Sequence, residues 1–368
     1  MKNAGKTGRT GRVLRRLGVS AVVLATVLGL SAAVAQGISP APPSTQAGSP
    51  QAGLASGTAS LAGQARLLVP TAGAKVAALA TVLERQTAAL SVPGGPTPSP
   101  AASTRAPELP ALLETALVSV RTLLVQAQQE PDGGLARLYT SAAQGRLEAL
   151  RPLLPAARLT RAGLMAGPPA SPAASCASGS PSPTDTTPVT TTAEASAPVT
   201  GGTGGTAPSS PAAFSASPEA VDATQAVLRA GRHLAYLYQV AEVRLDQDSR
   251  ADAAGSGAAV QDVIDEARAW VLASCAVPRL PEPGYEVSGA FLKAPEGGLS
   301  AVEHELAAAS LDLVAVSTGD LRTWAMTQYL AASARAARWS PMAVDGQALP
   351  GLPEAAPAVS PTPSPTTR

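Results

Sequence analysis

The sequence is poor in aromatic residues, in charged residues, in histidine and in cysteine. Aromatic residues make up 3% of the 368 residues, which excludes a core built mainly from large aromatic side chains. The sequence contains no nucleophile motif, no dinucleotide-binding glycine pattern and no zinc-type pair of cysteines. The net charge is +1, and no helical part carries a basic stripe, so nucleic-acid binding is not expected.

Proline and glycine are abundant but unevenly distributed. The 35 prolines and 33 glycines gather between alanine- and leucine-rich segments that have helical spacing. Because alanine favours helices, this distribution predicts helices joined by disordered tethers and argues against a sheet protein. We therefore expect an all-α fold: a four-helix bundle near the C-terminal end, a further helical segment before it, and long tethers.

The N-terminus has the pattern of an export signal. Six basic residues within residues 1–16 precede an uncharged run over 17–35, which ends in the small-x-small site Ala33-Val34-Ala35. Cleavage after Ala35 would leave Gln36 as the first residue. The alternative is an uncleaved membrane anchor, because the run is just long enough to span a bilayer. Either way, we expect an exported, extracytoplasmic or cell-envelope protein, which residues 17–35 would anchor in the membrane if they are not cleaved.

Two helical parts are separated by low-complexity sequence. A polar spacer over 36–53 precedes a helical segment over 54–165, which could form a small bundle of its own or pack on the C-terminal bundle; the interpretation favoured here is a loosely associated unit. Residues 166–216 contain too few apolar side chains to offset their chain entropy, so a disordered linker is predicted. Residues 343–368 form a Pro-rich tail.

Residues 217–342 contain four predicted amphipathic helices. Ser217 is a good N-cap and Pro218 suits the first helical position. The stretch 253–257 is expected to break the chain between the first and second helices. The short break over 317–320 predicts that the third and fourth helices form an antiparallel hairpin. The apolar residues of the fourth helix, over 321–339, point to more than one side. We expect residues 217–353 to fold without the rest of the chain.

Four short stretches in this part carry a family resemblance. Their order and spacing resemble the ferritin-like domain of unknown function found in exported actinobacterial proteins. Arg232 stands where that family usually has an acidic residue. The resemblance covers residues 217–353 and implies a four-helix bundle, but no activity. The stretches are Arg232-His233-Leu234-Ala235-Tyr236, Pro281-Glu282-Pro283-Gly284-Tyr285, Arg335-Ala336-Ala337-Arg338-Trp339 and Leu349-Pro350-Gly351-Leu352-Pro353.

The fold analogy raises the hypothesis of a metal site, which the residues do not favour. Di-metal bundles use Glu-x-x-His motifs, but alanines stand three residues before both His233 and His304. A mononuclear metal or haem site from His233, Glu303 and His304 is an alternative, and exposed polar side chains are the simpler interpretation. Buried carboxylates without a metal are costly, so we expect the acids to point to solvent. No metal and no cofactor are predicted.

The two cysteines, Cys176 and Cys275, are candidates for a disulfide. Outside the cytoplasm an even number of cysteines favours pairing. Neither segment offers a histidine partner that would make a cysteine catalytic.

These observations predict a protein that is not an enzyme. The leading hypothesis is a non-catalytic interaction or structural module with an unidentified envelope partner, which contacts the membrane only through its N-terminal hydrophobic segment. The alternative is a small-ligand or metal-binding protein with a pocket inside the bundle. A pocket that His233 and His304 both line would favour the alternative.

Overall fold

The computed structural model describes residues 49–91, 98, 107–155, 216–340 and 347–352. Within these ranges the regular structure is entirely helical, which confirms the all-α prediction. The predicted signal over 1–35 and nearly all of the linker over 166–216 lie outside the described residues.

The first four described helices, α2 to α5, form an N-terminal unit. α2 (Pro50–Ala72) packs on α3 (Ala74–Leu90), and α4 (Leu109–Gln129) packs on α5 (Gly133–Leu150). The two pairs meet through contacts of α3 with α5 and of α2 with α4. α2 begins within the predicted spacer, four residues earlier than expected.

α4 is the one helix in the described ranges whose length and mean hydropathy of 1.3 would suit a membrane span. One of its faces is buried against neighbouring helices, and core helices of globular proteins have the same composition. Its buried residues recur at helical spacing: Leu112, Leu113, Ala116, Leu117, Val120, Leu123, Leu124 and Ala127.

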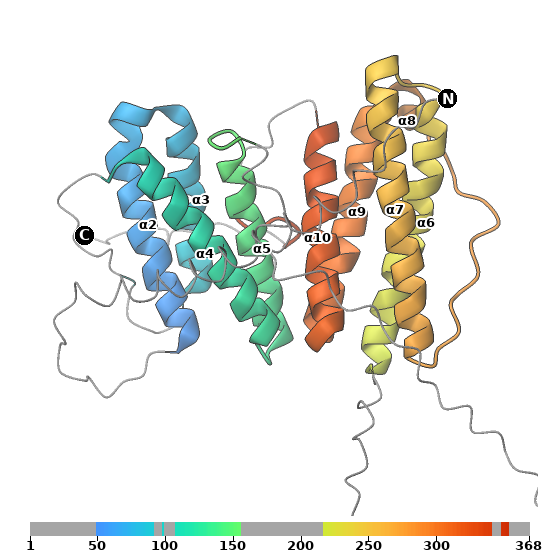
Figure 1. Cartoon of the computed structure of the whole chain (residues 1–368), viewed down its shortest axis with the longest axis horizontal. Coiled ribbons are helices and arrows are strands. Elements are labelled where there is room, and N and C mark those ends of the chain that lie inside the picture. Colours follow the sequence, from blue (N-terminus) through green and yellow to red (C-terminus); the bar gives the residue numbers. More distant parts are fainter. Residues whose placement is uncertain (1–48, 92–97, 99–106, 156–215, 341–346, 353–368) are drawn as a thin grey trace, which may run out of the picture. The chain divides into compact units, whose positions relative to one another are not determined.

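The remaining helices form a C-terminal unit. α6 (Pro218–Glu242) packs on α7 (Gln247–Ala273), and α9 (Pro295–Val316) packs on both α6 and α10 (Gly319–Trp339). The short α8 (Gly289–Lys293) lies on α9. Figure 1 shows α6, α7, α9 and α10 running alongside one another, with α9 and α10 as the predicted hairpin.

The start of α6 is confirmed, whereas the predicted break before the second helix is wrong. Ser217 Oγ accepts from the backbone N–H of Ala220 at 3.1 Å. The side chain of Asp246 caps α7 in the same way, through Ser249 N–H at 2.9 Å, so α7 runs unbroken through the stretch 253–257. Gly257 is retained in the helix because it lies close to α6: an added Cβ would come 3.3 Å from Tyr238 Cβ.

The mixed pattern of α10 follows from its central position. α10 contacts α9, α7, α4 and α5, so little of its circumference faces solvent (Figure 1). A helix enclosed in this way has no single polar face. The expectation from the sequence is a loosely associated N-terminal segment; in the structure the described helices of both units belong to one compact body.

Residues 349–352, within the predicted Pro-rich tail, form an ordered turn. The N–H of Leu352 bonds to the carbonyl oxygen of Leu349 at 3.2 Å, and Gly351 has a φ of 78°. Proline followed by a glycine of positive φ is the signature of a type II turn. This C-terminal segment, residues 347–352, contacts both units.

Candidate functional site

A fully buried carboxylate lies at the centre of the C-terminal unit. Glu303 of α9 is 0% exposed. The expectation that the acids point to solvent is therefore wrong for this residue. The reason is a partner from α10, Arg335, which neutralises the carboxylate inside the core.

The carboxylate of Glu303 is held by three donors. Arg335 Nε donates to Oε1 at 2.6 Å and its terminal nitrogen donates to Oε2 at 3.0 Å. The Tyr238 hydroxyl, from α6, donates to Oε1 at 2.5 Å and accepts from Trp339 Nε1 at 2.9 Å. Three helices thus meet at one closed hydrogen-bond network.

Burial dominates the protonation of this network. It raises the pKa of Glu303 above its ordinary value, and the guanidinium of Arg335 opposes that shift. Burial also raises the pKa of Tyr238, with the Glu303 charge adding to the effect. The phenol therefore keeps its proton and remains a donor. A carboxylate with both oxygens engaged in this way is not arranged as a metal ligand.

The structure does not bring the three metal candidates together. His233 stacks on Tyr285 with ring centroids 5.1 Å apart, and its Nδ1 lies 3.9 Å from a carboxylate oxygen of Glu305. His304 lies on the exposed side of α9, where partial desolvation lowers the pKa of its imidazole. Across the described ranges no three His, Cys, Asp or Glu side chains are grouped so that they could hold a metal ion.

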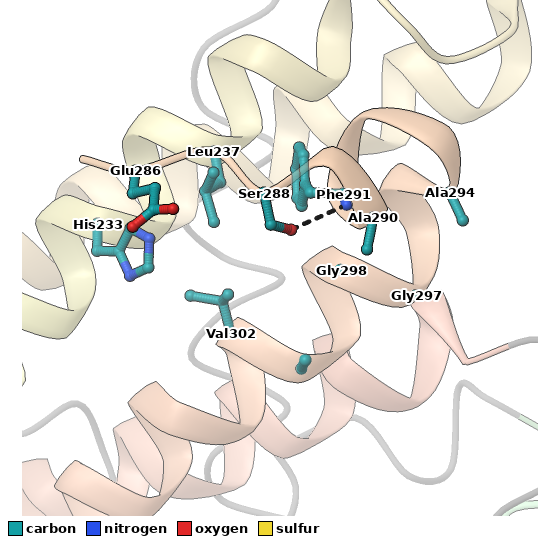
Figure 2. Close-up of a pocket in the computed structure, with 11 residues that line it drawn as sticks. His233, Leu237, Glu286, Ser288, Ala290, Phe291, Ala294, Gly297, Gly298 and Val302 are labelled. Carbon is teal, nitrogen blue, oxygen red and sulfur yellow. Dashed lines mark hydrogen bonds between the residues drawn. The ribbon is translucent and has the colours of Figure 1, made fainter.

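His233 contributes instead to a surface pocket of about 500 Å³ (Figure 2). The pocket lies between α6, α8 and the start of α9. Figure 2 shows His233 and Glu286 at one end and Phe291 with Ala290 at the other. The rest of the lining is small or apolar: Leu237, Ser288, Ala294, Gly297, Gly298, Ala301 and Val302.

Two local features shape this pocket. Ser288 Oγ accepts from the N–H of Phe291 at 3.1 Å and so caps α8. Gly298 lies directly beneath the Phe291 ring, because any Cβ at this position would overlap the ring. Among the residues that line the pocket, only His233 is a candidate site residue from the sequence. Glu286 lies before α8 and Phe291 lies within this short helix, and no periodic pattern in the sequence marks either residue.

Cys275 is disulfide-bonded. Its predicted partner, Cys176, lies outside the described residues, so the predicted pairing stays a prediction. Cys275 has a φ of 59° and follows the C-cap of α7. The N–H groups of Cys275 and Ala276 bond back to Leu272 and Val271, which is the Schellman arrangement. The predicted signal cleavage between Ala35 and Gln36 also lies outside the described residues.

The comparisons with known proteins match only part of the chain. Residues 223–354 match the model of a family described as "Domain of unknown function (DUF4439)". No curated protein and no solved structure matches the chain. The matched range contains the network around Glu303, the pocket and the C-terminal segment, and it excludes the N-terminal unit.

Proposed function

We propose that this chain is a non-catalytic helical protein of the cell envelope that binds or supports another envelope component. The ferritin-like character of the bundle and an origin among exported actinobacterial proteins are part of this proposal. The observation that carries it is the network around Glu303. The one fully buried carboxylate of the described chain is paired with Arg335 and Tyr238 and is not free for chemistry.

A ferritin-type metal centre does not fit the residues present. Such a centre needs carboxylates and imidazoles from facing helices, all directed at one point. Here Arg335 occupies the space beside Glu303, and a guanidinium repels cations.

Two observations support a location outside the cytoplasm. Disulfides persist in oxidising compartments, and Cys275 is disulfide-bonded. The basic and uncharged stretches at the N-terminus have the order of an export signal. Mass spectrometry of the protein from an envelope fraction tests this part of the proposal. A chain that begins at Gln36 is expected, and intact Met1 in the cytoplasmic fraction would contradict cleavage and export.

The connection after α7 offers a surface for a partner. Val277 and Leu280 are 86% and 89% exposed although they are large and apolar. Their backbone is nevertheless fixed, because Gln225 donates to the Val277 carbonyl at 2.9 Å and accepts from the Arg279 N–H at 3.0 Å. These two neighbouring apolar side chains on an ordered connection are therefore a candidate contact surface for a partner.

Photo-crosslinking in the native envelope tests the partner. A photoreactive residue replaces Leu280 in the full chain, and a matched one replaces the exposed Arg121 on α4. We expect one discrete crosslinked envelope protein from position 280 and none from position 121. The same product from both positions, or no product from position 280, would contradict a specific surface there.

The pocket favours a second candidate function, binding of a small amphipathic ligand. Its walls are apolar and its polar end carries Glu286 and His233, so a cationic head group would suit that end. A long-chain alkylammonium should bind more tightly than the alcohol of equal chain length. Glu286→Gln should remove that preference, whereas Glu282→Gln, outside the pocket lining, should retain it. Equal binding of the two probes would contradict this candidate.

A further inference from the structure

The C-terminal segment is held by buried donors from both units. Gln86 of α3 donates from Nε2 to the carbonyl oxygen of Ala348 at 2.8 Å. The hydroxyls of Ser141 on α5 and Tyr329 on α10 both donate to the carbonyl oxygen of Pro350, at 2.8 and 2.7 Å. All three donor residues are at most 1% exposed. Buried donors lose free energy when an acceptor is withdrawn, so these side chains need the segment in place.

A buried arginine, Arg146, fixes the orientation of the side-chain amide of Gln86. Arg146 Nε donates to Gln86 Oε1 at 2.7 Å, and its terminal nitrogen donates to Thr58 Oγ1 at 2.6 Å. The Gln86 oxygen is thereby occupied, and its NH₂ group faces the carbonyls of Ala142 and Ala348. Burial lowers the pKa of Arg146 to about 10, so the guanidinium still carries its charge at neutral pH.

The shape of this region also fits a peptide backbone. The carbonyl oxygen of Gln347 lies 2.8 Å from where a Cβ at Gly145 would stand, so α5 has room there only for glycine. At the other end of the segment, Gly351 lies against Leu311 and Tyr329. Its positive φ is one that other residues adopt only with strain. Glycines on both sides thus allow the segment to approach the helices closely.

We propose that Gln86, Ser141, Gly145, Leu311 and Tyr329 form a peptide-binding site, and that residues 347–352 of the same chain occupy it. The site recognises two backbone carbonyls and a proline–glycine turn. Gln86 and Ser141 belong to the N-terminal unit, whereas Leu311 and Tyr329 belong to the C-terminal unit. An occupied site therefore joins the two units, and an empty one leaves donors of both without acceptors.

The test separates the segment from the folded full chain. A protease site placed within residues 341–346 is cut after folding, and a fluorescent synthetic peptide of residues 347–353 is then added. We expect the labelled peptide to replace the cut fragment and to bind saturably, with binding lost on addition of unlabelled peptide. The uncut chain should bind the labelled peptide at least tenfold more weakly, because its own segment fills the site.

Peptide and site variants make the test specific. A peptide with Gly351→Ala should bind about fivefold to thirtyfold more weakly, because a left-handed alanine costs roughly 1–2 kcal/mol. Tyr329→Phe in the cut protein should also weaken binding, and the exposed Tyr236→Phe is its matched control. The proposal is overturned if the cut fragment separates while the helix content and the melting temperature stay unchanged and no labelled peptide binds.

A second measurement needs no cleavage. In the intact chain Gly145→Ala should displace the segment and accelerate hydrogen exchange of the Leu352 N–H, which bonds to Leu349. Gly255→Ala, on an open part of α7, is the control. Should Gly145→Ala prevent folding, Ser141→Ala gives the milder variant with the same expected direction. Unchanged exchange in both Gly145→Ala and Ser141→Ala would also overturn the proposal.

Discussion

At the residue scale, the pair of Glu303 and Arg335 should dominate the response to mutation in the C-terminal unit. Removal of either partner leaves an unpaired buried charge. We expect Glu303→Ala or Arg335→Ala to lower the free energy of unfolding by about 3–5 kcal/mol. Replacing both residues by methionine should lower the free energy of unfolding by much less than the two single losses together, because no unpaired charge then remains in the core.

Urea unfolding of the two single variants and the double variant measures this coupling. Tyr238→Phe removes a hydrogen bond to a charged group and should lower the free energy of unfolding by a smaller amount, roughly 1.5–3 kcal/mol. If the losses of unfolding free energy in the two single variants simply add up in the double variant, Glu303 and Arg335 do not interact energetically.

His304 should make stability depend on pH in a defined direction. Its pKa is lowered in the folded state, so folding favours the neutral imidazole. The stabilisation is complete above the ordinary histidine pKa and is lost as the pH falls through the folded pKa. The loss of melting temperature between pH 8 and pH 5 should therefore be smaller in His304→Gln than in the wild type. An equal or larger loss in the variant would contradict this sign.

The burial of Glu303 can be predicted only in part from the sequence. The apolar residues Leu299, Val302 and Leu306 recur at helical spacing and place residue 303 beside the buried face of its helix. Its burial depends on Arg335, which is 32 residues away on a helix whose faces the pattern does not resolve. Only the packing of α9 on α10 reveals that the two side chains meet. Glu286 could not be predicted as a pocket residue for a similar reason: only the folded structure brings it beside His233.

At the element scale, the N-terminus of α5 should tolerate no side chain at Gly133. An added Cβ would overlap the backbone carbonyl of Ala315 near the end of α9. Gly133→Ala should destabilise by about 1–3 kcal/mol through this overlap. Gly57→Ala in α2, where nothing lies within 4 Å, should stabilise by roughly 0.5–1 kcal/mol.

Thermal unfolding of the two glycine variants compares these effects directly. Opposite shifts of the melting temperature are expected. A rise of the melting temperature in both variants would mean that α5 and α9 do not approach each other as closely as the structure shows.

Cys275 combines a disulfide with a strained backbone, and two substitutions separate the contributions. Both Cys275→Ala and Cys275→Gly remove the disulfide, but glycine adopts the φ of 59° without strain. Cys275→Gly should therefore be more stable than Cys275→Ala by roughly 1–2 kcal/mol. Chemical unfolding of both variants measures the difference. Equal stabilities would indicate that the end of α7 rearranges once the disulfide is removed.

Element boundaries were predictable where local chemistry decides them. The cap at Ser217 and the hairpin of α9 and α10 follow from a few neighbouring residues. The continuity of α7 does not, because Gly255 and Gly257 resemble a break until the helix is packed on α6. At these glycines, packing against α6 outweighs their low helix propensity.

At the scale of the whole molecule, Arg322 should determine whether the two units unfold together. Its guanidinium, on α10, donates to the carbonyls of Ala127 and Glu130 at the end of α4. It also donates to its neighbour Ser317 at 2.6 Å. A cation at a helix C-terminus binds its free carbonyls and offsets the helix dipole. Arg322→Ala should lower the stability and broaden or split the unfolding transition.

Arg338→Ala is the matched control for this effect, because Arg338 lies on the same helix and is exposed. Calorimetry of both variants is the measurement. One sharp transition at the wild-type temperature in Arg322→Ala would show that the units are coupled elsewhere. A split transition, by contrast, would favour the prediction that residues 217–353 fold alone.

The central place of α10 has a consequence for the order of events during biosynthesis. Gln128 and Thr323, which join α4 to α10, are 195 residues apart, and Gln86 and Ala348 are 262 apart. At about 5–20 residues per second, a ribosome needs roughly 10–40 s to bridge the first gap. Contacts between such distant residues also slow folding itself. During that interval the N-terminal helices present to solvent the surface that α10 later covers.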